Sequence, residues 1–125
     1  MWMNLLWLSA AGMAGTLSRY GTNFLAKRLM GADYPWGTLA VNAVGCLLIG
    51  AVWEVVEVKR WIGEPASLAI LVGFLAAFTT FSSYAFETVQ MLQSGRCMAA
   101  VGYVFTQNAL GLALVWAEIQ TVRRV

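Results

Sequence analysis

The sequence contains no histidine, and Asp, Glu, Lys and Arg together make up only 11% of its 125 residues. Without histidine, the chain lacks the commonest metal ligand and the usual base for serine and cysteine nucleophiles. We therefore expect neither a classical zinc site nor Ser/His or Cys/His catalysis, and a protein that is not an enzyme. Soluble domains carry about 25% charged residues, whereas 60% of this chain is hydrophobic. Because a body this small cannot bury so much apolar surface, the composition predicts an integral membrane protein.

Cysteine is also scarce: Cys46 and Cys97 lie in or beside apolar runs and show no CxxC spacing. We interpret both as buried small apolar residues, with a disulfide or a reactive thiol as the alternative. The net charge of +2 is too weak to indicate a nucleic-acid partner. Met1–Ser9 contains no Lys or Arg, which disfavours a cleaved signal peptide. The partner that the composition predicts is the lipid membrane.

Four apolar runs are separated by short polar loops. A helix of about 20 residues matches the hydrocarbon thickness of a bilayer. We therefore predict an all-α integral membrane protein in which residues 1–125 form a single four-span domain with both termini on one side. Because four spans give little lateral cover for intramembrane polar groups, we also expect homo-oligomerisation. The predicted spans cover residues 2–20, 36–58, 66–92 and 98–119.

Lysine and arginine are divided equally between the two sides of this topology. One side holds Arg19, Lys27, Arg28 and Arg96, and the other holds Lys59, Arg60, Arg123 and Arg124. The bias of Lys and Arg between loops sets the orientation of a membrane protein. An equal division therefore favours insertion in both orientations and antiparallel pairing.

The stretch at residues 73–87, GFLAAFTTFSSYAFE, places hydroxyl side chains inside the third apolar run. Polar groups at bilayer depth need partners within the protein. A single Ser or Thr there often bonds only to its own i−4 carbonyl, but a cluster with amides on neighbouring spans favours a shared polar lining. The hydroxyls belong to Thr79, Thr80, Ser82 and Ser83, and the amides to Asn42 and Gln107.

Strips of small and polar residues recur at helical spacing in the other runs. Residues four apart share one face of a helix, and small residues let helices approach closely. We expect these strips to form the contacts between spans. They comprise Ala11, Gly12 and Gly15 in the first run, Thr38, Asn42, Cys46 and Gly50 in the second, and Tyr103, Gln107 and Gly111 in the fourth.

Three aromatic residues, Phe78, Phe81 and Tyr84, recur every three positions beside the hydroxyls. We expect their rings to stack along one side of the hydroxyl face. Hydroxyl and amide groups donate hydrogen bonds, and aromatic ring edges carry positive charge density. A lining of donors and ring edges without carboxylates favours a small anion over a cation. A purely structural aromatic cluster is the alternative.

Arg19 and Glu87 bracket the polar stretch near the ends of two spans. Long charged side chains in such positions extend to the interface. For Arg19, a role in an ion pathway or vestibule competes with a structural salt bridge or an interfacial anchor.

Three stretches together resemble the Fluc (CrcB) family of small fluoride channels. That family has a glycine-rich first helix ending in arginine, a PxGTxxxN start to the second span and a GGxTTFSTF break in the third. This chain has AAGMAGTLSRY at 10–20, PWGTLAVNAVGCLLIG at 35–50 and GFLAAFTTFSSYAFE at 73–87. The resemblance covers almost the whole chain. It implies a fluoride-selective channel that exports fluoride passively across the bacterial inner membrane.

The resemblance also implies a broken third helix and an antiparallel, dual-topology homodimer with two pores and a structural Na⁺ at its centre. The backbone carbonyls of Ala76 and Thr79 match the Na⁺ ligands. The residues that match the ion pathway are Asn42, Phe81, Tyr84, Thr80, Ser82, Ser83, Tyr103, Gln107, Arg19 and Glu87.

Two positions depart from the family pattern. Tyr84 stands where the family usually has a second pore phenylalanine, which places a hydroxyl near the ion path. Ala76 and Ala77 replace paired glycines, which narrows the backbone freedom available for the break. Carbonyl coordination by alanine is still chemically possible, because the ligand atoms belong to the main chain.

Two other functions compete with a channel. A small multidrug exporter is also a short, dual-topology dimer, but its chemistry needs a carboxylate in the first span, and Trp2–Ser18 has none. A structural membrane subunit would leave the clustered hydroxyls unexplained.

Overall fold

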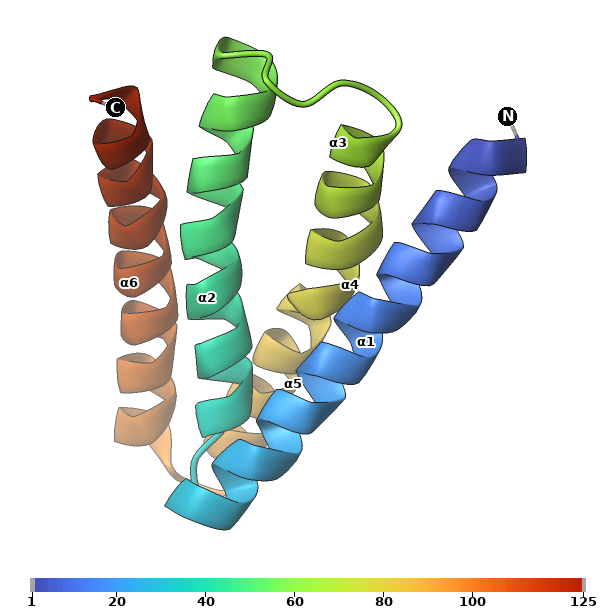
Figure 1. Cartoon of the computed structure of the whole chain (residues 1–125). Coiled ribbons are helices and arrows are strands. Elements are labelled where there is room, and N and C mark those ends of the chain that lie inside the picture. The colour runs from blue at the N-terminus through green and yellow to red at the C-terminus, as the bar shows by residue number, and fades with distance from the viewer. Residues whose placement is uncertain (1, 125) are drawn as a thin grey trace.

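The computed structural model describes residues 2–124, and every regular element in that part of the chain is helical (Figure 1). Met1 and Val125, the outermost residues of the predicted domain, lie outside the described residues. The elements are α1 (Trp2–Met30), α2 (Trp36–Trp53), η1 (Glu54–Val58), α3 (Ala66–Leu68), η2 (Ala69–Leu75), α4 (Ala76–Phe78), α5 (Phe81–Gln93) and α6 (Cys97–Arg123). The helices form four consecutive rod-shaped segments, called rods below: α1, then α2 with η1, then α3 to α5, and finally α6. This confirms the predicted all-α class.

Three of the rods are long and apolar enough to cross a membrane, judged by the length and composition of the described helices. They cover Trp36–Val58, Ala66–Gln93 and Cys97–Arg123. The remaining rod, α1, extends to Met30, past the predicted end of the first span at residue 20. Gly31 follows the helix, and its positive φ of 87° is accessible to glycine at little steric cost. α1 begins and α6 ends at the same end of the bundle (Figure 1).

α1 packs against the first half of the third rod through small residues. A Cβ added at Gly15 would collide with the carbonyl of Phe74 and lie 3.1 Å from the Cβ of Ala77. A Cβ added at Gly73 would lie 2.7 Å from the Cβ of Ala11. The glycine strip predicted in the first run is therefore a helix-packing surface, as expected.

α2 and α6 run in the same direction and pack against each other (Figure 1). A Cβ added at Gly111 would lie 3.2 Å from the Sγ of Cys46, and one at Gly50 would lie 2.9 Å from the carbonyl oxygen of Val115. The strips predicted on the second and fourth runs therefore face each other.

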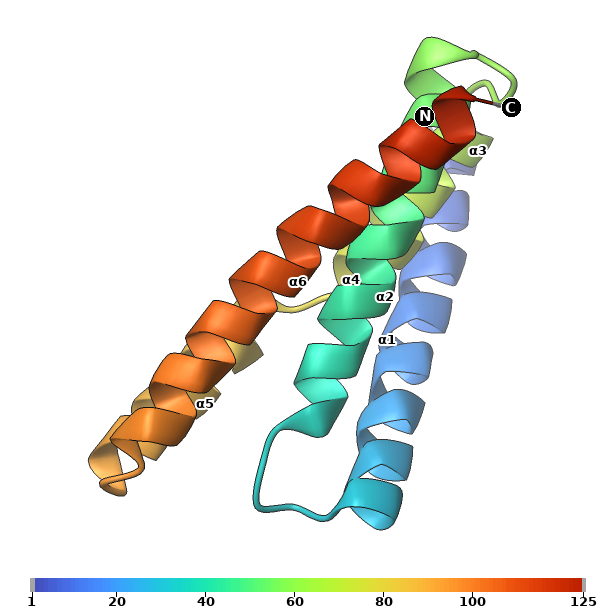
Figure 2. The same ribbon diagram turned by 90° about the vertical axis from the view of Figure 1, so that its left-hand side faces the viewer.

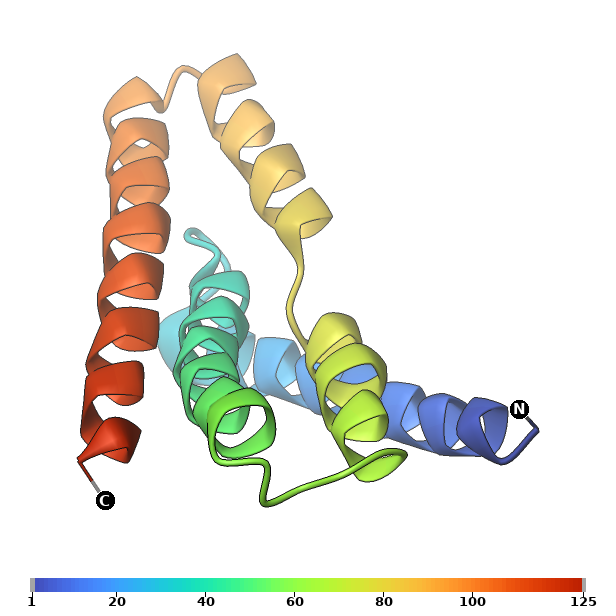
Figure 3. The same cartoon turned by 90° about the horizontal axis from the view of Figure 1, so that it is seen from above.

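The third rod changes partners at its middle. Its first half, from α3 to α4, lies against α1, whereas α5 lies against α6 (Figure 3). The change of direction is also visible from the side in Figure 2, where α5 follows α6 away from α1. Residues 79 and 80 connect the two halves and are central to the candidate site.

Large apolar side chains cover the outside of the chain. Phe81 is 78% exposed, Phe105 72% and Leu112 74%. Hydrocarbon solvates such side chains, so this surface fits a lipid environment or contact with further protein.

Both cysteines are free thiols. Cys46 is half-buried in the α2–α6 interface, in line with the predicted packing role. Cys97 is exposed, so the prediction that it is buried is wrong, because it is the first residue of α6 and adjoins the polar loop at residues 93–96.

Candidate functional site

Thr79 and Thr80 separate α4 from α5 with extended backbone. Their φ and ψ angles are −81° and 161° for Thr79 and −153° and 115° for Thr80, far from helical values. Thr80 then caps α5, because its Oγ1 accepts a hydrogen bond of 3.2 Å from the backbone N–H of Ser83. The hydroxyl cluster that the sequence places inside an apolar run therefore surrounds the start of a new helix.

Asn42 of α2 holds this extended segment by both ends of its amide. Its Oδ1 accepts from the backbone N–H of Thr80 at 2.9 Å, and its Nδ2 donates to the Thr80 carbonyl at 3.1 Å. Unpaired backbone groups at bilayer depth would each cost several kcal/mol. The asparagine side chain thus replaces hydrogen bonds that the interrupted helix has lost, which explains why an amide is tolerated inside an apolar run.

A continuous chain of hydrogen bonds runs from Asn42 along α6. The Nδ2 of Asn42 also lies 3.5 Å from the Oε1 of Gln107, and Gln107 Nε2 donates to the Tyr103 hydroxyl at 3.1 Å. Tyr103 in turn donates to Oε2 of Glu87 at 2.8 Å. The structure therefore brings together four predicted site residues from three helices. Such a network is strongest when every member is satisfied.

The carboxylate of Glu87 accepts hydrogen bonds from two hydroxyl groups. In addition to Tyr103, Oγ1 of Thr38 donates to Oε1 of Glu87 at 2.7 Å. Short hydrogen bonds from hydroxyl groups to a carboxylate are about twice as strong as those between neutral groups. Glu87 is therefore anchored by hydrogen bonds to α2 and α6, and its half-buried side chain also lines a pocket near the end of the bundle.

Arg19 lies apart from this network. The half-buried Arg19 makes no ion pair within residues 2–124, where the one ion pair joins Arg123 and Glu54. Its backbone carbonyl accepts from Nδ2 of Asn23 at 2.9 Å. The salt bridge that we considered for Arg19 is therefore absent from the described part of the chain.

The aromatic residues divide into two groups. Phe81 and Tyr84 have ring centroids 5.6 Å apart, and Tyr84 and Tyr103 lie at 5.5 Å. Phe78 instead stacks on Phe74 at 5.6 Å. The prediction of one series through Phe78, Phe81 and Tyr84 is wrong, because three-residue spacing aligns side chains only within a continuous helix and the extended residues intervene.

Ser82 and Ser83 complete the hydroxyl cluster. Oγ1 of Thr80 lies 3.3 Å from Oγ of Ser82 and donates to Oγ of Ser83 at 3.1 Å. Thr79 behaves differently, since its hydroxyl bonds its own i−4 carbonyl at Leu75, 2.9 Å away. The three hydroxyls after the extended backbone therefore form the shared polar group, and Thr79 contributes chiefly through its main chain.

The carbonyls of Ala76 and Thr79 have both lost their usual helical donors. In an uninterrupted helix they would accept from the N–H groups of Thr80 and Ser83. Those two groups instead donate to Oδ1 of Asn42 and Oγ1 of Thr80. Main-chain carbonyls of this kind suit an alkali cation. The described residues include no cluster of three or more Cys, Asp or Glu side chains that suits a metal ion.

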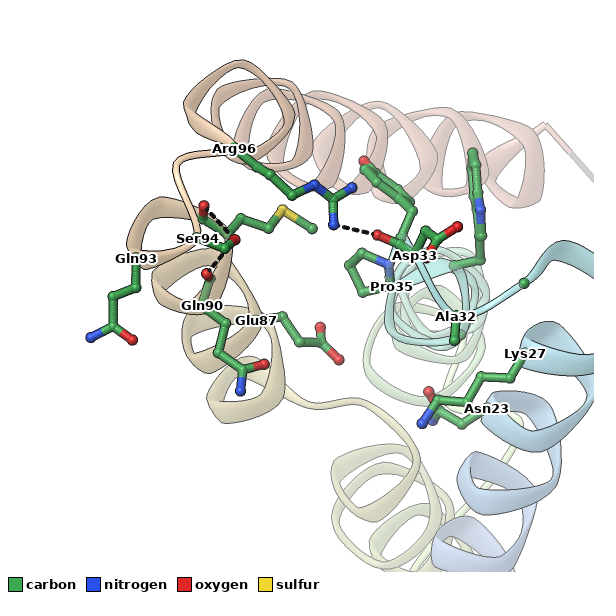
Figure 4. A pocket seen from close by; sticks show the side chains of 15 residues that line it. Asn23, Lys27, Ala32, Asp33, Pro35, Glu87, Gln90, Gln93, Ser94 and Arg96 are labelled. Carbon is green, nitrogen blue, oxygen red and sulfur yellow. Dashed lines mark hydrogen bonds between the residues drawn. The ribbon is translucent and has the colours of Figure 1, made fainter.

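Two hollows adjoin the network. A groove of about 450 Å³ lies beside the extended segment and is lined by Asn42, Ala76, Thr80, Phe81, Tyr84, Gln107 and Asn108, among others. A second pocket of about 630 Å³ opens near the C-terminal ends of α1 and α5. In that pocket Glu87 and Gln90 face Lys27 and Asn23 across the cavity (Figure 4). Glu87 therefore belongs both to the part-buried network and to an open pocket.

The rim of this second pocket is fixed by the loop at residues 31–35. Arg96 donates from Nη1 to the carbonyl of Asp33 at 2.6 Å (Figure 4). Burial raises the pKa of the Tyr34 phenol.

Two further polar residues, one in the network and one beside the groove, were not predicted as site residues. Thr38 was assigned only to the packing strip, although its position four residues before Asn42 places both on one face. Asn108 donates to the Tyr84 hydroxyl at 3.2 Å, and its position beside Gln107 is the only signal that the sequence contains.

Comparisons with known proteins agree on one family. The family profile described as "CrcB-like protein, Camphor Resistance (CrcB)" matches residues 6–119. A protein of Nitrosococcus oceani named "Fluoride-specific ion channel FluC" is 43% identical over 116 residues, covering 93% of each chain. Proteins of the same name from Nitratidesulfovibrio vulgaris (strain Miyazaki F) and Acidobacterium capsulatum are 40% and 35% identical and cover 94% and 98% of this chain, and 95% and 98% of their own length.

Proposed function

The chain belongs to the CrcB-like family, and we propose that it is a fluoride-selective ion channel that lets fluoride leave the cell passively. It is a multi-pass membrane protein, and its relatives are named as ion channels rather than enzymes. The observation that carries the proposal is the part-buried network from Asn42 to Glu87, two of whose members, Asn42 and Gln107, line a groove. The identity of the ion rests on the relatives' name.

The chemistry of the network supports passage of a small, strongly hydrated anion. An ion leaves water only where protein groups replace its hydration shell, and it moves on only where no single group holds it too tightly. The hydroxyls of Thr80, Ser82 and Ser83 supply donors of moderate strength. The exposed ring of Phe81 adds positive ring edges at the same groove.

We further propose that two copies pair in an antiparallel, dual-topology homodimer with two pores. The open groove and the exposed Phe81 support this arrangement, since one copy leaves both uncovered. The equal division of Lys and Arg between the two sides agrees with insertion in both orientations. The interrupted third helix would then lie at the contact between the copies.

A structural Na⁺ at the dimer centre is part of the same proposal. The carbonyls of Ala76 and Thr79 fit this role, because Thr80 and Ser83 direct their N–H groups elsewhere. Each copy would supply these two oxygen ligands. The ion would hold the two interrupted helices together electrostatically and take no part in the movement of fluoride.

Ion efflux from liposomes tests the channel function. We expect purified wild-type protein to release fluoride much faster than chloride, and Phe81→Ile to slow fluoride release strongly while the protein elutes at an unchanged size. No fluoride release from well-folded wild-type protein would contradict the channel function. A rate that saturates with an imposed proton gradient would favour an exporter instead.

A further inference from the structure

Asn108 of α6 has a side-chain amide whose orientation is fixed by two hydrogen bonds. Its Nδ2 donates to the carbonyl of Val104 at 2.8 Å and to the hydroxyl of Tyr84 at 3.2 Å. A carbonyl oxygen accepts but cannot donate, so the nitrogen of the amide must face Val104. Both N–H groups of Asn108 are then engaged, and the Tyr84 oxygen must act as the acceptor.

This arrangement decides what the Tyr84 hydroxyl can do. A phenol can accept and also donate one hydrogen bond. Because Asn108 occupies the accepting position, the O–H hydrogen is directed away from Asn108, and it has no acceptor among residues 2–124. The Tyr84 ring is itself held between Phe81 at 5.6 Å and Tyr103 at 5.5 Å. The donor therefore has a defined position.

The position is beside the proposed ion pathway. Tyr84 and Asn108 line the same groove as Asn42 and Gln107. Both N–H groups of Asn42 are already directed to Thr80 and Gln107, so this amide has none to spare for an ion. The Tyr84 hydroxyl offers the groove a donor that no hydrogen bond within the described chain uses.

We propose that Tyr84 donates its O–H to the fluoride ion as it passes, and that Asn108 is the positioning residue that keeps this hydroxyl in the donating orientation. The inference rests on the proposed fluoride channel and gives one of its steps a named donor. Tyr84 would then interact with the ion through a hydrogen bond from its hydroxyl as well as through the edge of its ring.

The test is the dependence of fluoride efflux on fluoride concentration in liposomes. We expect Tyr84→Phe and Asn108→Leu each to raise the half-saturating fluoride concentration about fivefold, the effect of losing one hydrogen bond of ordinary strength. The double variant should show no larger shift than Tyr84→Phe alone, since Asn108 acts through that hydroxyl. Tyr20→Phe is the matched control, because Tyr20 is 71% exposed and lines neither hollow.

The outcomes separate this inference from the channel function. Wild-type efflux with an unchanged half-saturating concentration in Tyr84→Phe would overturn the role of the hydroxyl and leave the channel intact. A double variant whose shift equals the product of the two single shifts would overturn the positioning role of Asn108. Absence of fluoride efflux from folded wild-type protein would overturn both the channel and the inference.

Discussion

Glu54 and Glu87 lie toward opposite ends of the α2–α6 pair, and different partners hold them there. Glu54 is 1% exposed, and its carboxylate meets Nε of Arg123 at 3.2 Å. Glu87 is half-buried and receives hydrogen bonds from the neutral hydroxyls of Thr38 and Tyr103. One carboxylate is paired with a guanidinium group, whereas the other accepts from two hydroxyl groups and lines an open pocket.

Two chemically identical side chains are thus held by different kinds of partner, one by a guanidinium group and the other by hydroxyl groups. An ion pair joins the ends of two helices and leaves no donor for a passing ion. Hydroxyl groups can rotate, and those around Glu87 connect through Gln107 to Asn42 and the extended segment. We therefore expect substitutions at Glu87 to affect ion flux and substitutions at the Glu54–Arg123 pair to affect stability.

The largest effect is expected for Glu87→Ala. This change removes the acceptor of two charge-assisted hydrogen bonds worth about 1.5–3 kcal/mol each, and Tyr103 loses the partner that orients the rest of the network. Fluoride efflux should fall at least about a hundredfold, since every 1.36 kcal/mol corresponds to a factor of ten. Efflux per folded protein measures the change. A rate within about threefold of wild type, which is under 1 kcal/mol, would mean that the carboxylate has no part in the pathway.

Arg123→Gln should mainly lower stability. Leaving one partner of a buried ion pair alone costs about 3–5 kcal/mol, but the Arg123 side chain is 55% exposed. Water screens it, so we expect a loss of about 1–2 kcal/mol, visible as a lower midpoint of thermal unfolding in detergent. Efflux per folded protein should stay at the wild-type level. If Arg123→Gln kept normal stability but lost flux, the ion pair would belong to the ion pathway and the assignment of the two carboxylates would be wrong.

Thr38→Val should lower fluoride efflux less than Glu87→Ala does. Valine keeps the shape of threonine but leaves Glu87 with the Tyr103 hydroxyl alone. We expect fluoride efflux to fall about tenfold, which corresponds to the loss of one hydrogen bond to a charged group. Thr38→Ser is the matched control, because it keeps the hydroxyl and should retain most of the flux. Equal loss in both variants would indicate a packing defect instead.

Much of this arrangement follows from the sequence. Apolar runs predicted the helices, and four-residue spacing placed Asn42 and Gln107 each on a strip of small and polar residues, because both patterns depend on periodicity within one helix. The glycine strip likewise predicted that another helix packs closely on α1. Which strips meet is information that only the structure supplies, as in the contact of Asn42 with Gln107, 65 positions apart.

Other features could not be predicted because they depend on the extended backbone at residues 79 and 80. This segment separates Phe78 from Phe81, so a series that looks regular in the sequence is divided in space. It also turns α5 toward α6, which brings Glu87 within reach of Thr38, 49 positions away in the chain. The Tyr84–Asn108 bond arises from the same change of direction.

The most direct test of the channel and its Glu87 network is fluoride efflux from liposomes, recorded with a fluoride electrode for wild type, Glu87→Ala and Arg123→Gln and divided by the amount of folded protein. We predict fast efflux for wild type, the same rate per folded protein for Arg123→Gln, and a rate at least about a hundredfold lower for Glu87→Ala. Wild-type protein that releases no fluoride, or Glu87→Ala that releases it as fast as Arg123→Gln, would contradict the proposal.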